Sequence, residues 1–240
     1  MRDQKDIETP GISQLDNSSE HNCYLYNIER ISYTKCLNLQ HEFHELCAAQ
    51  SIPGMLMLLE HDPVITMGVK SSSKGNVIVS PQILTAQGVE LVQTDRGGDV
   101  TYHGPGQLVG YPIFRLREMG GDLHGYLRSL EQSVIDTLAE FGLAGGRNGP
   151  AGVWVGEKKV CSIGVAVRKW VTYHGFALNV SPNLAHFSLI NPCGLASEQI
   201  TSMAELLGTA PNMNDVREVY ARCFANIFGI RLQPWLGVIE

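Results

Sequence analysis

Cys193 stands in the tetrapeptide Asn-Pro-Cys-Gly, residues 191–194. A proline stiffens the approach to this cysteine and a glycine leaves space beside the sulfur, so a substrate could reach the thiol. The thiolate is the reacting form of a cysteine, so a thiol in such a place could act as a nucleophile. The alternative is an ordinary loop cysteine, which is the commoner fate of an isolated thiol. The flanking residues favour the functional interpretation.

A working cysteine needs a nearby cation that lowers its pKa, and two lysines are candidates. Lys158 falls at the turn of an expected hairpin, whereas Lys159 lies one step inside it. There Lys159 is expected opposite Trp154 and on the same face as Cys161 and Ile163. A lysine on an apolar strand face is costly to desolvate. Either its ammonium group extends to water, or it is kept buried for a functional role, and the pattern leaves both interpretations open.

Residues 96–107 read Arg-Gly-Gly-Asp-Val-Thr-Tyr-His-Gly-Pro-Gly-Gln. Glycine lets the backbone come close to a ligand, while the arginine, histidine and hydroxyl side chains supply directed hydrogen bonds. The alternative is an elaborate turn between two strands, and the spacing does not decide between them. The segment matches neither a P-loop nor a dinucleotide-binding fingerprint.

Residues 173–179 read Tyr-His-Gly-Phe-Ala-Leu-Asn and carry one further candidate, His174. The small and apolar residues after it could line a slot for an aliphatic chain. The alternative is a sheet strand with one satisfied histidine. His41 and His44 have helical spacing, but no third ligand is near in sequence, so we interpret them as surface residues rather than a metal site.

Helices and strands that would position these residues follow from apolar periodicity and turn residues. Helices are expected over 33–49, 122–141, a segment starting at Ser202, and 214–228; strands over 55–59, 64–67, 152–155, 158–167 and 171–180. The 55–59 and 64–67 strands are expected to pair, and Gly156-Glu157 fits a two-residue hairpin turn. Because the elements do not alternate regularly and hairpins recur, the pattern predicts an α+β fold in one domain.

Composition excludes several classes of function. The 240 residues carry a net charge of −6 without a basic stripe, which argues against nucleic-acid binding. Residues 1–22 are polar and lack the apolar core of an export signal, so we expect a flexible tail before a single catalytic domain over 23–240. No apolar run approaches the about 18 residues of a membrane helix. We therefore expect a cytoplasmic protein with mostly reduced cysteines.

The segments 96–112, 158–180 and 191–195 together resemble the octanoyltransferases of lipoate biosynthesis, also called lipoyl(octanoyl) transferases. The resemblance runs in order from about Cys23 to the last helix. It implies a mixed β-sheet flanked by helices, similar to the biotin and lipoate protein ligases. It also implies that Cys193 is the nucleophile and that Lys159 assists it. The implied substrate-binding residues are Arg96, Gly97, Gly98, Asp99, Val100, Thr101, Tyr102, His103, Ser162, Ile163, Gly164, Gly175, Phe176 and Ala177.

The resemblance further implies the substrates. The donor would be octanoyl-acyl carrier protein, which carries its acyl group on phosphopantetheine. The acceptors would be lysines of lipoyl domains, in 2-oxoacid dehydrogenase subunits and in the glycine cleavage H protein. No ATP is expected, because exchange of one thioester for another is nearly balanced and amide formation runs downhill. No metal is expected either. The alternatives are an ATP-dependent lipoate or biotin-type ligase, a noncatalytic binding protein of the same fold, and a cysteine hydrolase.

Overall fold

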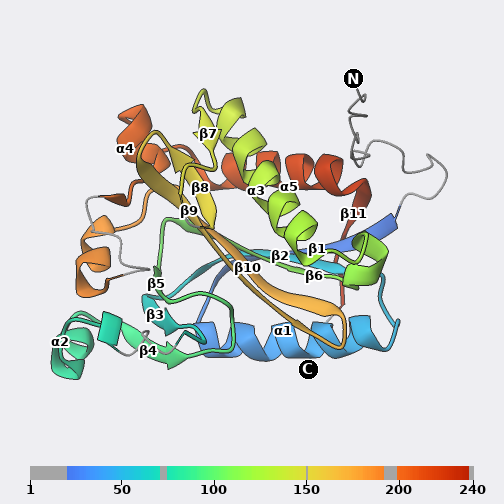
Figure 1. Cartoon of the computed structure of the whole chain (residues 1–240), viewed down its shortest axis with the longest axis horizontal. Helices are drawn as coiled ribbons and strands as arrows, with labels where there is room; N and C mark the ends of the chain where they lie inside the picture. Colours follow the sequence, from blue (N-terminus) through green and yellow to red (C-terminus); the bar gives the residue numbers. More distant parts are fainter. Residues whose placement is uncertain (1–20, 71–74, 150, 192–198, 238–240) are drawn as a thin grey trace, which may run out of the picture.

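The computed structural model describes residues 21–70, 75–149, 151–191 and 199–237 (Figure 1). The predicted tail lies almost entirely outside these residues, since the first strand begins at His21. The division into a tail and one catalytic domain therefore stays a prediction. Cys193 also lies outside the described residues. Within them, no helix is both long and apolar enough to cross a bilayer.

Eight strands of the described chain form one mixed sheet in the order β11-β1-β2-β6-β10-β9-β8-β7. They are β1 (His21–Ile31), β2 (Met55–His61), β6 (Gln107–Ile113), β7 (Gly145–Gly146), β8 (Gly152–Val155), β9 (Lys158–Arg168), β10 (Val171–Asn179) and β11 (Ile230–Pro234). Strand β1 runs parallel to β2 and β11, and the other pairs are antiparallel. The mixed sheet and its hairpins confirm the predicted α+β class.

Three more strands form a small second sheet, β4 (Glu90–Gln93), β3 (Val64–Met67) and β5 (Val100–His103), with β3 in the middle. The expected pairing of the 55–59 and 64–67 strands is wrong. Strand β2 already has a partner on each edge, β1 and β6, so it offers no free edge to β3. The chain bends at Asp62 and Pro63 and starts the second sheet instead.

Helices cover both faces of the large sheet (Figure 1). They are α1 (Tyr33–Ala48), α2 (Pro81–Ala86), α3 (Leu123–Glu140), α4 (Met203–Leu207) and α5 (Met213–Phe228), with short 3₁₀ helices η2 (Leu116–Met119) and η3 (Leu184–Leu189). Helix α1 packs on one face, against β6 and β10, while α3 and α5 lie together on the other. Helix α2 lies beside β4 of the small sheet.

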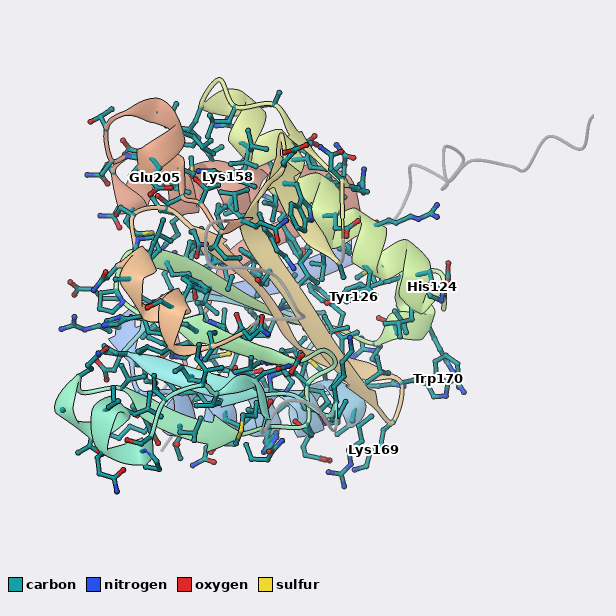
Figure 2. All side chains as sticks on the ribbon, turned by 60° about the vertical axis from the view of Figure 1, so that its left-hand side comes forward. His124, Tyr126, Lys158, Lys169, Trp170 and Glu205 are labelled. Carbon is teal, nitrogen blue, oxygen red and sulfur yellow. The ribbon has the colours of Figure 1, made fainter. Side chains whose placement is uncertain are left out.

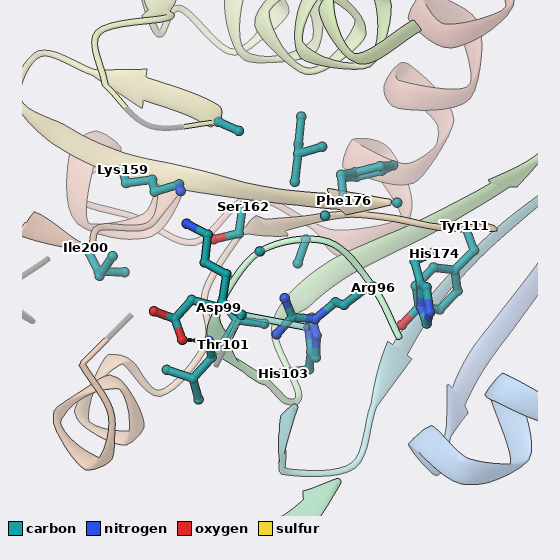
Figure 3. Close-up of a pocket in the computed structure, with 18 of the residues that line it drawn as sticks. Arg96, Asp99, Thr101, His103, Tyr111, Lys159, Ser162, His174, Phe176 and Ile200 are labelled. Carbon is teal, nitrogen blue, oxygen red and sulfur yellow. Dashed lines mark hydrogen bonds between the residues drawn. The ribbon is translucent and has the colours of Figure 1, made fainter. Parts of the chain in front are cut away.

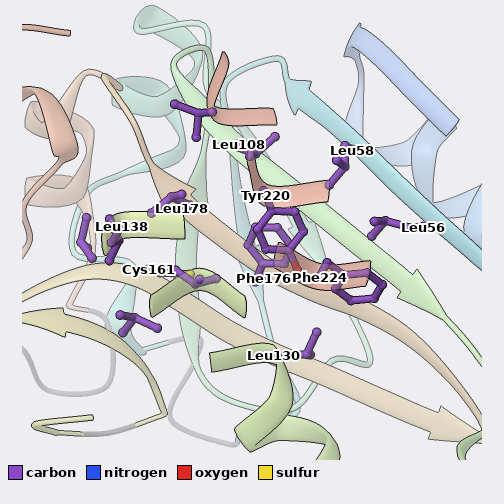
Figure 4. Packing of buried hydrophobic residues seen from close by; sticks show 14 of the residues in the cluster. Leu56, Leu58, Leu108, Leu130, Leu138, Cys161, Phe176, Leu178, Tyr220 and Phe224 are labelled. Carbon is purple, nitrogen blue, oxygen red and sulfur yellow. The ribbon is translucent and has the colours of Figure 1, made fainter. Parts of the chain in front are cut away.

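The largest apolar core lies between the sheet and the helix pair α3 and α5 (Figure 4). Helix α3 contributes the predicted apolar stripe, including the buried Leu130 and Leu138, and Asp122 caps its first turn. Tyr220 of α5 packs on Phe176 of β10 with ring centroids 4.3 Å apart. This core holds β9 and β10 in place from one side, which leaves their other side to build a site.

Two hairpin turns bound strand β9. Gly156 has φ 59° at the first position of the turn before it, as predicted. Lys169 and Trp170 form the turn after it, with φ of 51° and 62°. Figure 2 shows Lys158 at one end of this strand and the Lys169–Trp170 turn at the other. The strand between them carries the candidate site residues.

Candidate active site

The segment between β4 and β5 is fixed by Arg96. Its guanidinium is buried and donates from Nη2 to the Thr66 carbonyl at 2.7 Å and from Nε to the Thr66 hydroxyl at 3.2 Å. The next residue, Gly97, donates its N–H to the carbonyl of Val165 on β9 at 2.9 Å. A side chain at Gly164 would come within 2.7 Å of the Gly97 carbonyl. The glycines therefore let this segment lie directly against β9.

The segment and strands β9 and β10 enclose a cavity of about 140 Å³ (Figure 3). Most of the residues singled out from the sequence line it. They are Arg96, Gly98, Asp99, Val100, Thr101, His103, Lys159, Ser162, Ile163, Gly164, His174, Gly175, Phe176 and Ala177. Residues more than 70 positions apart in the chain thus meet at one place, which fits a ligand site.

Two of the singled-out residues lie elsewhere in the described chain. Gly97 attaches the segment to β9, as described above. Tyr102 is buried in the core between the small sheet and η3, and its hydroxyl lies 2.7 Å from Nδ1 of His186. Strand alternation accounts for this, because Tyr102 points opposite to Thr101 and His103, which line the cavity. A part for Gly97 and Tyr102 in substrate binding stays a prediction.

Sequence reasoning missed six residues that complete the lining, namely Tyr33, Lys70, Tyr111, Ala151, Phe187 and Ile200. Tyr33 opens helix α1 and Tyr111 stands in strand β6. Both tyrosines fit apolar patterns that are equally typical of plain core residues. Only the crossing of α1, β6 and β10 brings their hydroxyl groups to the cavity, so the pattern carried no signal for them.

Lys159 is buried, with 6% of its surface exposed, and it lines the cavity from β9. It pairs with Trp154 as predicted, and its Nζ lies 5.7 Å from the centre of that indole ring. The expectation that it shares a face with Cys161 is wrong. The register shifts between Val153 and Trp154, so β9 has one extra residue there, and Val160 and Cys161 both turn into the apolar core.

Cys161 is thereby excluded from the cavity side of the sheet. Burial raises the pKa of its thiol to about 12. The other described cysteines, Cys23, Cys36, Cys47 and Cys223, are buried as well. These five behave as small core residues, as predicted for most of the cysteines.

A chain of hydrogen bonds holds His103, which lines the cavity. Asn179 donates to the carbonyl of Thr201 at 2.9 Å and accepts from Gln107 Nε2 at 2.9 Å. Gln107 Oε1 accepts from His103 Nδ1 at 2.8 Å, and His103 Nε2 faces the Thr66 hydroxyl at 3.4 Å. Burial lowers the pKa of His103 well below its usual value, so the ring is neutral and each nitrogen has one role. The chain ends at the hydroxyl that also accepts from the buried guanidinium.

Both ends of the segment that contains Cys193 are attached to the cavity. Before it, Asn191 donates its N–H to the carbonyl of Asn76 at 2.7 Å, and the Asn76 amide donates to Asp99 at 2.7 Å. After it, Ile200 lines the cavity and bridges to Lys159. Of the described flanks of residues 192–198, Ile200 therefore lines the cavity directly, and Asn191 is linked to it through Asn76 and Asp99.

The remaining histidine candidates differ in their surroundings. His174 is buried at the cavity, and its Nε2 lies 2.9 Å from Asp95 Oδ1. His41 is exposed, as expected. His44 is buried, contrary to the expectation of a surface residue, because its ring packs against Tyr173 and its Nε2 lies 3.0 Å from the Arg168 carbonyl.

Comparison with known proteins gives the family. The model of the lipoyl protein ligase A/B catalytic domain matches residues 32–225. An octanoyltransferase of Solibacter usitatus is 45% identical over 214 residues, covering 89% of this chain and 96% of that protein. An octanoyltransferase of Caldicellulosiruptor saccharolyticus is 44% identical over 214 residues, covering 88% and 89%. These matches confirm the resemblance seen in the motifs.

Solved structures agree in fold. A lipoate-protein ligase A bound with ATP superposes with a TM-score of 0.69 at 19% identity, covering 90% of each chain. A biotin protein ligase of Aquifex aeolicus superposes with a TM-score of 0.53 at 14% identity, covering 85% of this chain and 70% of that one. Similarity at this level of identity shows the architecture, and the chemistry has to be argued from the residues of the site. By its sequence, the chain belongs to the octanoyltransferases, within the lipoyl protein ligase A/B catalytic domain family, and its fold agrees with that family.

Proposed function

We propose that this octanoyltransferase works through an acyl thioester on Cys193. The octanoyl group would come from the phosphopantetheine thioester of acyl carrier protein and would pass to a lysine of a lipoyl domain. Residues that line the cavity would hold the acyl chain, and Lys159 would assist the reacting groups at its end.

The observation that carries this proposal is the buried Lys159 in the cavity wall, which forms a bridge with Ile200 on one flank of residues 192–198. Asn191, on the other flank, is linked through Asn76 to Asp99 of the same cavity. Cys193 follows Asn191 by two residues, a span of at most about 7 Å along the chain. Thiolate chemistry needs a cation near the sulfur, and a buried lysine against the flank of the segment that carries Cys193 supports this pairing.

The first step would be thioester exchange. The Cys193 sulfur would attack the acyl carbonyl carbon, the bond from that carbon to the phosphopantetheine sulfur would break, and the departing thiolate would take up a proton. One thioester replaces another, so this step is nearly balanced in free energy and needs no ATP.

The second step would form the amide. The acceptor lysine, as a neutral amine, would attack the acyl carbon, lose a proton and displace the Cys193 thiolate. Lys159 supports both steps as an ammonium that stabilises the thiolate and as a neutral amine that accepts the proton. The two steps together make the reaction ping-pong.

The cavity lining fits an acyl chain between polar ends. Ile163, Phe176, Ala177 and Val100 present apolar surface, and the glycines of β9 and β10 leave room for a chain. The bound part of the substrate would be excluded from water, which protects the acyl thioester from hydrolysis. This surrounding favours transfer over the hydrolase alternative.

The test is intact-mass spectrometry of the protein mixed with octanoyl-acyl carrier protein, with and without an apo lipoyl domain. The wild-type chain should gain one octanoyl group and lose it to the lipoyl domain, without ATP. Cys193→Ala should gain none. Cys161→Ala is the matched control, since that thiol is buried in the core and should not be acylated.

Two outcomes would contradict the proposal. Full transfer activity in Cys193→Ala would exclude the thioester on that residue. Transfer from free octanoate or lipoate that requires ATP, with no transfer from the acyl carrier protein, would identify a ligase instead.

A further inference from the structure

Two consecutive side chains of strand β10 bind the same carboxylate. The Tyr173 hydroxyl donates to Asp95 Oδ2, and Nε2 of His174 lies 2.9 Å from Asp95 Oδ1. The two rings lie beside each other with centroids 4.9 Å apart. In a regular strand, neighbouring side chains point to opposite faces of the sheet. Strand β10 must therefore depart from regular geometry at this point.

The departure is at His174, whose φ of 56° lies in the left-handed region. That region is unfavourable for a residue with a side chain, so other contacts must hold it. The His174 N–H donates to Gln40 Oε1 of α1 at 2.9 Å, and its imidazole is held by Asp95. Strain of this kind persists where the surroundings fix it, and it gathers at functional sites.

The carboxylate also determines the tautomer of this imidazole. Because a carboxylate accepts hydrogen bonds, Nε2 of His174 carries the proton and Nδ1 is left as an acceptor. Nδ1 faces the Tyr33 hydroxyl at 3.5 Å. Burial lowers the pKa of His174, and the hydrogen bond from His174 lowers the pKa of Asp95, so a neutral ring faces a charged carboxylate.

This arrangement stands at one end of the cavity. Figure 3 shows His174 and Tyr111 at the end opposite Lys159 and Ile200. With the acyl carbonyl near Lys159, as the proposed function has it, the methyl end of the chain would extend toward His174. We propose that Asp95 is a positioning residue that fixes His174 there and so limits the length of the acyl chain that is accepted. This inference rests on the proposed function.

The test compares octanoyl and decanoyl thioesters of acyl carrier protein as donors, with the rate of acyl-enzyme formation read by intact mass. In Asp95→Ala the imidazole of His174 loses the carboxylate that holds it, and the end of the cavity can retreat. The preference for octanoyl over decanoyl should fall by about tenfold, since a fitted apolar pocket discriminates one methylene by at least that factor.

Three variants separate positioning from general damage. Asp95→Asn keeps an acceptor for His174 and a donor for the Tyr173 oxygen, so it should retain most of the preference. His174→Gly suits the left-handed backbone and removes the ring, so its preference should fall as in Asp95→Ala. Asp122→Ala removes the exposed carboxylate that caps α3 and should leave the preference unchanged.

The outcomes distinguish the two proposals. A wild-type chain that forms no adduct with either donor overturns the acyl-thioester function and the length limit with it. Wild-type adducts with an unchanged preference in both Asp95→Ala and His174→Gly overturn the part assigned to Asp95 alone.

Discussion

Strands β9 and β10 have two buried faces of opposite character. Toward α3 and α5 they present Val160, Cys161 and Leu178, which pack in the largest apolar core. Toward the cavity they present Lys159 and His174, which are also buried. Apolar groups need only well-fitting neighbours, whereas each buried polar group needs a partner in the right place. The polar groups on the cavity face serve chemistry and add little stability. The apolar packing on the core face supplies the stability of these strands.

Removing Lys159 should give the largest effect. Lys159→Ala is expected to lower kcat/KM for octanoyl transfer by about 10²–10⁴-fold, the usual contribution of a positioned acid or base. Lys158→Ala is the matched control, because Lys158 is exposed at the hairpin turn, and it should keep wild-type activity. Steady-state assays with the acyl carrier protein donor measure both. An equal loss of kcat/KM in both variants would contradict a specific catalytic part for Lys159.

Truncating the core face should affect stability and leave the chemistry intact. Leu130 is fully buried on α3, so Leu130→Ala should lower the free energy of unfolding by about 2–5 kcal/mol. Leu123→Ala, at an exposed position of the same helix, should change it by less than about 0.5 kcal/mol. Urea unfolding measures both. If Leu130→Ala also lowers kcat of the folded enzyme at low temperature, the two faces are not independent.

Lowering the pH should reduce the stability of the fold through the buried histidines near the cavity. Burial lowers the pKa of His61 to about 4, whereas the unfolded chain takes up this proton near 6.5. Between these values the unfolded state binds more protons, so stability falls as the pH falls. From pH 7 to pH 5, His61 should contribute a loss of about 2 kcal/mol. Urea unfolding of His61→Gln should show a loss smaller by that amount, and an equal loss would contradict the prediction.

The smallest effect concerns Thr66, whose hydroxyl contacts His103 and Arg96 of the cavity lining. Thr66→Val removes a hydroxyl that accepts from Arg96 and faces His103, at nearly constant volume. It should lower the free energy of unfolding by about 1–2 kcal/mol and weaken donor binding, seen as a higher KM. Thr85→Val, at an exposed threonine of α2, is the control. An unchanged KM would show that this chain of hydrogen bonds does not contribute to substrate binding.

Most of the candidate site was predictable because it depends on rare local chemistry. The glycine-rich segment with Arg96 and the lysine inside a hairpin are unusual in plain strands, and nearly all of these residues line the cavity. Tyr33 and Asp95 were not predictable. Tyr33 fits an ordinary helix pattern. Asp95 contacts His174 because that residue of β10 has a left-handed backbone conformation, which turns its imidazole toward the carboxylate.

By itself, the sequence determined the class of fold, the family, the helices α1, α3 and α5 and the hairpin strands β8, β9 and β10, since these follow from periodicity, turn residues and motifs that are local in the chain. Strands β1 and β6 of the large sheet were not predicted. Tertiary structure decided which strands share a sheet and which face of β9 carries Lys159. Strand partners depend on which edges are already occupied, and a single extra residue at Val160 reverses the direction of the side chains that follow. No local pattern reports either of these facts.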